Sequence, residues 1–113
     1  MKHVRGILRP ESLTKVLEVL KESKVARFYV SRTKALGAGV DPEAYQVATD
    51  EGGAYSEKIV VEFLCPADRV DGLLDTLRGA ARTGHRGDGV IVVSDAVDVV
   101  NVRTGDRGPI ALL

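Results

Sequence analysis

The sequence has few of the residues from which disulfides, metal sites and catalytic centres are usually built. Among its 113 residues there are one cysteine, Cys65, and two histidines, His3 and His85. A single thiol cannot form an internal disulfide, which excludes a secreted disulfide framework. Neither histidine has a second metal ligand at a useful spacing, and no nucleophile motif such as G-x-S-x-G occurs. These absences predict a protein without a metal site and without catalytic residues of its own.

An excess of one charge and long hydrophobic runs are also missing. The chain has 16 basic and 16 acidic residues, a formal net charge of zero. Nucleic-acid binding needs a clustered basic surface, so this balance argues against a nucleic-acid partner. No stretch reaches the ~18 consecutive apolar residues of a transmembrane helix, and residues 1–6 lack the apolar core of a signal peptide. We expect a single cytoplasmic domain that is short enough for oligomerisation to bury useful surface.

The apolar residues that are present follow helical spacing in two segments and form short runs elsewhere. The spacing i, i+3, i+4, i+7 relates Leu13, Val16, Leu17 and Leu20, and again Val70, Leu73, Leu74 and Leu77. It predicts helices from about residue 11 and over residues 66–82. The predicted strands cover residues 2–9, 25–34, 58–64, 90–93 and 97–102. This order is typical of an α+β, ferredoxin-like βαββαβ domain with one additional C-terminal strand, over residues 1–113.

Residues 35–56 form a long connection rich in glycine, and a structureless segment of this length is commonly functional or disordered. Tyr45, Tyr55 and acidic residues such as Glu51 give it an aromatic and negative character. Such a segment is suited to docking on a basic partner surface by charge complementarity. A disordered loop with ordinary solvated charges fits the same composition equally well.

Two glycine- and arginine-containing segments are candidates for anion binding. Residues 83–89 place three glycines between a predicted helix and a predicted strand, beside Arg82, His85 and Arg86. Residues 103–108 follow the last strand with Arg103 and two further glycines. Glycine lets backbone N–H groups converge on an anion, and guanidinium groups add charged donors. The alternatives are a tight αβ turn that needs positive φ angles, and a solvated basic tail.

Taken together and in register, these segments resemble the PII signal-transduction family. The resemblance is carried by Met1-Lys2 with Arg9-Pro10, by Thr83-Gly84-x-x-Gly87-Asp88-Gly89, and by Arg103-Thr104-Gly105. It implies a ferredoxin-like homotrimer with an adenine nucleotide in each cleft between subunits. It also implies a flexible T-loop, here about residues 37–56, that grips a target metabolic enzyme or transporter, the latter through peripheral contact with a membrane transporter.

The resemblance assigns ligand roles to particular residues. Gly87, Asp88 and Gly89 would surround the phosphates, Arg103 would bind them, and Glu62 would lie near the adenine. The full nucleotide-binding set that it implies is Gly37, Lys58, Glu62, Leu64, Arg82, Thr83, Gly87, Asp88, Gly89, Val90, Asn101 and Arg103. The partner-binding set is Tyr45, Glu51 and Tyr55.

Several of these positions depart from the family pattern. Val90 replaces a phosphate-binding lysine, Asn101 replaces an arginine, and Tyr29 replaces an adenine-side threonine. Ala38 and Gly39 replace an arginine and a glutamine that helps to hold Mg²⁺ and 2-oxoglutarate, and Glu51 stands where some members carry a modified tyrosine. Each lost charge-assisted contact is worth about 1.5–3 kcal/mol. We therefore predict a preference for ADP or AMP over ATP and no sensing of 2-oxoglutarate; the role of Mg²⁺ stays open. The candidate replacement cations are Lys34, Arg82, Arg86 and Arg107.

Two other functions use the same fold. One is a small phosphate-ester hydrolase, for which only Asp88 and His85 offer a base near the phosphates. The other is a structural or metal-binding trimer that has lost its nucleotide.

Overall fold

The computed structural model describes residues 1–37, 45–48 and 53–112. The strands are β1 (Lys2–Leu8), β2 (Phe28–Ala35), β3 (Tyr45–Ala48), β4 (Gly53–Cys65) and β5 (Gly89–Asp95). The helices are α1 (Leu13–Glu22) and α2 (Val70–Ala81). Short 3-10 turns precede both helices, at Pro10–Ser12 and Ala67–Arg69, and another occupies Pro109–Leu112. Proline stands at the start of the first of these turns, where its missing N–H is not needed.

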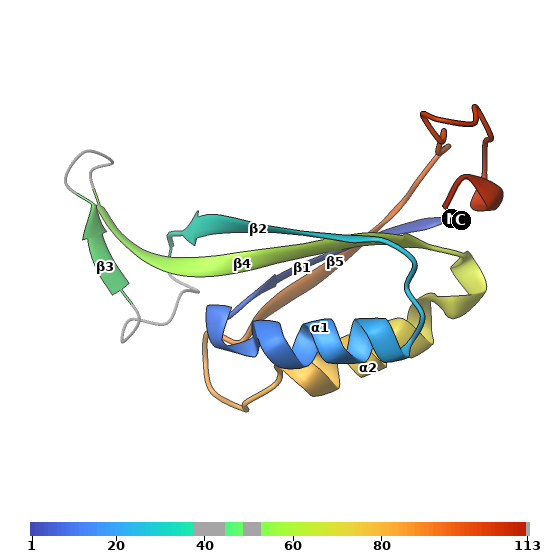
Figure 1. Ribbon diagram of the computed structural model, residues 1–113. Helices are drawn as coiled ribbons and strands as arrows, with labels where there is room; N and C mark the ends of the chain where they lie inside the picture. Colours follow the sequence, from blue (N-terminus) through green and yellow to red (C-terminus); the bar gives the residue numbers. More distant parts are fainter. Residues whose placement is uncertain (38–44, 49–52, 113) are drawn as a thin grey trace.

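The strands form one antiparallel sheet in the order β2-β4-β1-β5, with β3 paired to the N-terminal part of β4. Both helices cover the same face of this sheet, and no helix lies on the opposite face, where the C-terminal tail rises at one end (Figure 1). The strand order and the two helices on one side confirm the ferredoxin-like α+β fold.

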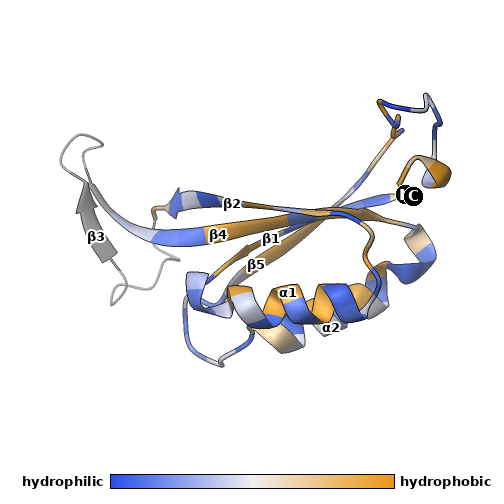
Figure 2. Ribbon diagram, viewed as in Figure 1, coloured by the Kyte–Doolittle hydropathy of each residue, from blue (hydrophilic) through white to orange (hydrophobic). Residues whose placement is uncertain are grey.

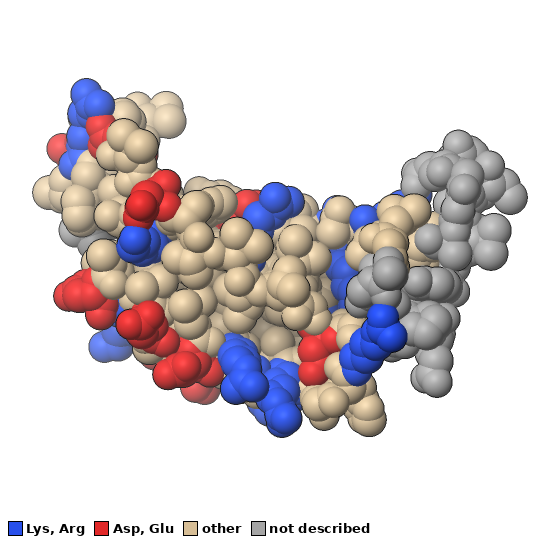
Figure 3. Space-filling view, turned by 180° about the vertical axis from the view of Figure 1, so that it is seen from behind, with Lys and Arg blue, Asp and Glu red and all other residues tan. Residues whose placement is uncertain are grey.

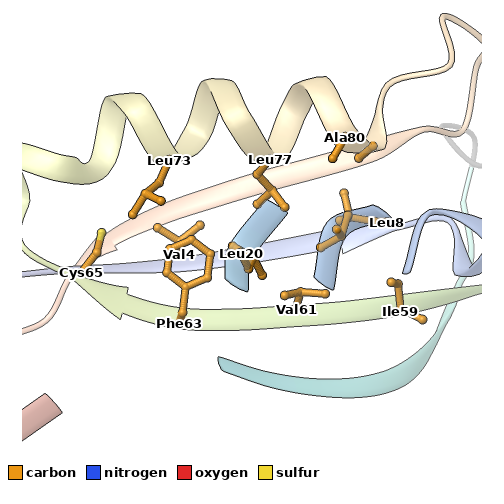
Figure 4. Close-up of a cluster of buried hydrophobic side chains, with 12 residues drawn as sticks. Val4, Leu8, Leu20, Ile59, Val61, Phe63, Cys65, Leu73, Leu77 and Ala80 are labelled. Carbon is orange, nitrogen blue, oxygen red and sulfur yellow. The ribbon is translucent and has the colours of Figure 1, made fainter. Parts of the chain in front are cut away.

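The register of β1 decides which residues enter the core. Val4 lies opposite Phe63 and Val93, and Leu8 lies opposite Ile59 and Gly89. Because side chains alternate along a strand, Val4, Leu8, Ile59 and Phe63 share the helix-covered face. Leu20 of α1 and Leu73 and Leu77 of α2 meet them from the other side (Figure 4). Hydrophobic colour accordingly concentrates in the middle of the sheet and alternates along the helices (Figure 2).

The open face of the sheet carries the intervening residues. It is partly apolar, and Tyr29 and Val90 are each 59% exposed while Val92 is 50% exposed. It also holds a charged cluster, in which Glu62 lies 3.3 Å from His3 Nε2 and 3.6 Å from Arg5 Nε. Neither helix reaches this face, and the described C-terminal tail borders it only at the end that carries Tyr29 and Leu64.

The predicted strand over residues 97–102 is wrong. The sheet ends with β5 at Asp95, and the tail forms only a single bridge between Val100 and Arg107. The reason lies in Asn101, whose N–H donates to Asp106 O (2.8 Å) and whose C=O accepts from Gly105 N (2.8 Å). This turn folds the tail back on itself before a strand can extend.

The long connection is also more regular than the prediction of an irregular segment over residues 35–56. Residues 45–48 form β3, which pairs with the start of β4 from Tyr45–Ser56 to Ala48–Gly53. As a result β4 begins at Gly53 rather than at the predicted residue 58 and is 13 residues long. Ala38, Gly39 and Glu51 lie outside the described residues.

Candidate functional site

The turn between α2 and β5 is organised around the carboxylate of Asp88. Asp88 Oδ2 accepts hydrogen bonds from the backbone N–H groups of Thr83 (2.8 Å) and Gly84 (2.9 Å). Its other oxygen accepts from the Thr83 hydroxyl and from Arg9 Nε, the latter at 3.1 Å. These donors, the Thr83 hydroxyl foremost, hold the pKa of Asp88 well below its usual range. Asp88 therefore braces the turn, and so strongly stabilised a carboxylate is a weak base.

Cations also hold the carbonyl groups of this turn. Lys58, only 4% exposed, donates from Nζ to Gly87 O at 2.5 Å. Arg9 donates from a terminal guanidinium nitrogen to Arg86 O, also at 2.5 Å. The turn is thus tied to both β4 and the end of β1, so its conformation depends on residues far away in the sequence.

The glycines of the turn confirm the interpretation as an αβ turn with positive φ angles. Gly84, Gly87 and Gly89 have φ values of 89°, 98° and 111°. At Gly89 a Cβ atom would lie 2.0 Å from Ile7 O, because the backbone of β5 meets that of β1 there. Glycine is required at this position by both the dihedral angle and the close approach.

A first hollow opens beside this turn on the open side of the sheet, and we call it the turn hollow. Its volume is about 310 Å³. Its lining includes Ile7, Lys58, His85, Gly87 and Val90. The structure therefore brings together several predicted phosphate-binding residues, with an exposed valine where the family has a lysine. Gly37, predicted at the base of the T-loop, follows the end of β2 with φ of 116°.

A second hollow of about 450 Å³ lies beside the C-terminal tail, and we call it the tail hollow. Its lining includes Arg27, Tyr29, Leu64, Asn101 and Arg103. The side chain of Asn101 holds the tail, since its Oδ1 accepts from the N–H groups of Arg103 (3.0 Å) and Thr104 (3.1 Å) and its Nδ2 donates to Ala111 O (3.1 Å). Arg27 was not singled out from the sequence, because a lone arginine in a short connection carries no pattern.

The two hollows occupy opposite ends of the sheet. Leu8 of β1 lies opposite Gly89, beside the turn hollow, whereas His3 lies opposite Leu64 of the tail hollow. Five residues along a strand span about 17 Å. One chain therefore does not bring Lys58 and Gly87 together with Leu64 and Arg103. Glu62 lies between the two ends, opposite Arg5 and Tyr29.

Three of the candidate replacement cations lie elsewhere. Arg82 lines a third hollow, of about 330 Å³, on the helix-covered side of the turn with Leu8 and Ile91. Arg107 is paired with Asp98 through its Nε at 2.7 Å. Lys34 Nζ lies 4.8 Å from the ring centroid of Tyr55, a cation–π contact that also engages one predicted partner-binding residue. The side chain of Tyr45, like Glu51, falls outside what the structure describes.

On the face shown in Figure 3, basic and acidic side chains are interspersed. None of the described helices is long and apolar enough to span a bilayer. In the described ranges no three histidine, cysteine or carboxylate side chains gather as metal ligands would.

Comparisons with known proteins agree with the fold. The family model for nitrogen regulatory protein P-II matches residues 1–106. The P-II protein of Mesorhizobium japonicum is 32% identical over 108 residues, covering 96% of each chain. P-II 1 of Escherichia coli is 30% identical over 112 residues, covering 99% of this chain and all of the relative.

A solved structure described as Arabidopsis thaliana PII bound to citrate superposes with a TM-score of 0.79. It is 30% identical, and the match covers 97% of this chain and 90% of that one. The family is one of signalling regulators and not of enzymes, which confirms the prediction of a non-catalytic protein. By a family match that extends over nearly its whole length, the chain belongs to the nitrogen regulatory protein P-II family.

Proposed function

We propose that this P-II protein is a cytoplasmic regulator that binds an adenine nucleotide in clefts between the subunits of a homotrimer. ADP or AMP is preferred to ATP. The protein controls a partner transporter or metabolic enzyme through its T-loop, about residues 37–56. The supporting observation is that the residues assigned to one ligand fall into two hollows at opposite ends of one sheet. A site that needs both hollows is complete only where two chains meet.

The open face of the sheet supports the trimeric assembly. It exposes Tyr29, Val90 and Val92, each half exposed or more, on the side that no helix covers. Burying apolar surface of this kind stabilises association by about 25 cal/mol per Å². Packing three such faces together would also set the turn hollow of one chain against the tail hollow of its neighbour.

The distribution of charge supports a ligand with few phosphates. Lys58 brings a positive charge to the turn hollow but already donates to Gly87 O. Val90 and Asn101 supply no charge where the family pattern has cations. A triphosphate that keeps its full charge in such a site loses more solvation than it gains in contacts, whereas a mono- or diphosphate is easier to neutralise. The relative from Arabidopsis is described with citrate bound, which is consistent with small anions as ligands of this fold.

The hydrolase alternative is less well supported than binding alone. Of the two candidate bases, Asp88 accepts hydrogen bonds from Thr83, Gly84 and Arg9, and its lowered pKa makes it a weak proton acceptor. An assay of phosphate release from ATP and ADP would test this alternative, and we expect no release above background.

Calorimetry with ATP, ADP, AMP and 2-oxoglutarate, with and without Mg²⁺, tests the proposal, together with sedimentation to establish the oligomeric state. We expect a trimer that binds ADP or AMP more tightly than ATP and does not bind 2-oxoglutarate. Tight Mg-ATP-dependent binding of 2-oxoglutarate would contradict the stated preference. No nucleotide binding at all, seen also as no thermal shift, would favour a structural or metal-binding trimer.

A further inference from the structure

The tail hollow has an unbalanced charge. Among its lining residues, Arg27 and Arg103 are cationic, and no carboxylate belongs to the lining that the structure describes. Neither guanidinium makes a hydrogen bond or an ion pair to the described part of the chain, whereas Arg9 and Arg107 are paired with Asp88 and Asp98. Two free guanidinium groups around one hollow attract an anion.

The remaining walls of the tail hollow are apolar and aromatic. Leu64, three valines and the half-exposed ring of Tyr29 line it. An aromatic ring of this kind is a platform on which a nucleobase stacks. The combination fits a ligand with a flat ring at one end and a negative group at the other.

We propose that Arg27 is a phosphate-binding residue that acts as a pair with Arg103, while the ring of Tyr29 stacks on the base. The amide of Asn101 carries no charge and is used to hold the tail, so it does not serve as a second cation beside Arg103. Arg27 supplies that second positive charge. Two guanidinium groups can neutralise the charge of one or two phosphate groups. Arg27 therefore contributes to the preference for AMP or ADP over ATP. This inference rests on the proposed function and deepens it.

The test compares ADP with adenosine, which has the same base and ribose but no phosphate. Binding of both is measured by calorimetry for the wild type, Arg27→Ala and Arg103→Ala, with Arg78→Ala as the matched control. Arg78 is an exposed arginine of α2 that lies outside both the turn hollow and the tail hollow. We expect Arg27→Ala and Arg103→Ala each to weaken ADP binding roughly 10- to 100-fold. Adenosine binding should change by less than about twofold, because it makes no phosphate contact.

Salt dependence and the conservative variant give further readouts. Arg27→Ala should reduce the slope of log Kd for ADP against log salt concentration, because one cation no longer meets the phosphate. Arg27→Lys should recover part of the affinity, since it keeps the charge but not the planar fork. If Arg27 had only a structural role, Arg27→Ala would leave the salt slope of ADP binding unchanged, and the charge kept in Arg27→Lys would not restore affinity.

The outcomes separate the inference from the proposed function. If Arg103→Ala weakens ADP binding and Arg27→Ala does not, the inference is overturned and the proposed function stands. If Arg27→Ala weakens ADP and adenosine equally, the phosphate role is overturned. If the wild type binds neither ADP nor AMP, the proposed function fails and the inference fails with it.

Discussion

Replacing Gly89 by alanine should destabilise the protein strongly, because two independent features require glycine there. Its φ of 111° lies in a region that residues with a Cβ atom rarely adopt, at a cost of about 1–3 kcal/mol. The new Cβ atom would also lie 2.0 Å from Ile7 O, a carbonyl fixed in the β1–β5 pairing. Relieving such a clash typically costs about 1–3 kcal/mol more. We expect Gly89→Ala to lower the free energy of unfolding by about 2–6 kcal/mol.

Gly79 provides the matched control for this measurement. It lies within α2, and a Cβ atom built on it has no neighbour within 4 Å. Gly79→Ala should therefore raise stability by about 0.5–1 kcal/mol, through helix propensity alone. Both variants are measured by urea denaturation at one fixed protein concentration, because an oligomer's midpoint depends on concentration. A Gly89→Ala midpoint equal to or above that of the wild type would refute the reasoning.

Three other substitutions test separate parts of the structure. Asp88→Asn should lower the free energy of unfolding most near neutral pH. The pKa of Asp88 is lowered in the folded state, so the ionised carboxylate stabilises the fold above the unfolded-state pKa of about 4. This stabilisation is lost as the pH falls below that value. Asn101→Ala should speed hydrogen exchange at the amides of Arg103 and Thr104, which lose their acceptor. Leu77→Ala, at a fully buried position, should lower the unfolding free energy by about 2–5 kcal/mol in urea.

Each of these three has a result that counts against it. A thermal melting difference between the wild type and Asp88→Asn that stays constant from pH 7 to pH 3 would show that the ionised carboxylate is not the brace. Unchanged exchange at both amides would mean that the tail is held without Asn101. If Leu77→Ala lowers the free energy of unfolding no more than Arg78→Ala, which changes an exposed residue, then Leu77 is not part of the core.

The two helices, in which apolar residues recur at helical spacing, were predictable from the sequence. The i, i+3, i+4 spacing around Leu17 and Leu74 predicts both helices, because a helix needs one apolar face to pack on the sheet. The valine-rich segment 97–102 shows how this reasoning fails. Valine favours strands only where its side chain packs, and Val97 and Val102 are fully exposed. Local hydrogen bonds of Asn101 decide the conformation there instead.

The candidate site was predictable in part. Glycine spacing and the resemblance place Gly87, Gly89 and Lys58 around one turn, and the structure brings them together. The bracing role of Asp88 depends on Arg9, which is 79 positions away, so no local pattern could reveal it. The pairing of Arg27 with the tail hollow depends likewise on how the tail folds back.

The central claim is that one nucleotide site is built from the turn hollow of one chain and the tail hollow of another. The direct measurement is ADP binding by Lys58→Met protein, by Arg103→Ala protein, and by trimers assembled from a mixture of the two. The account predicts that each variant alone binds weakly and that the mixture regains high-affinity sites, because some clefts then pair an intact Lys58 with an intact Arg103. If the mixture binds no better than the separate variants, while the wild type binds tightly, the shared site is contradicted.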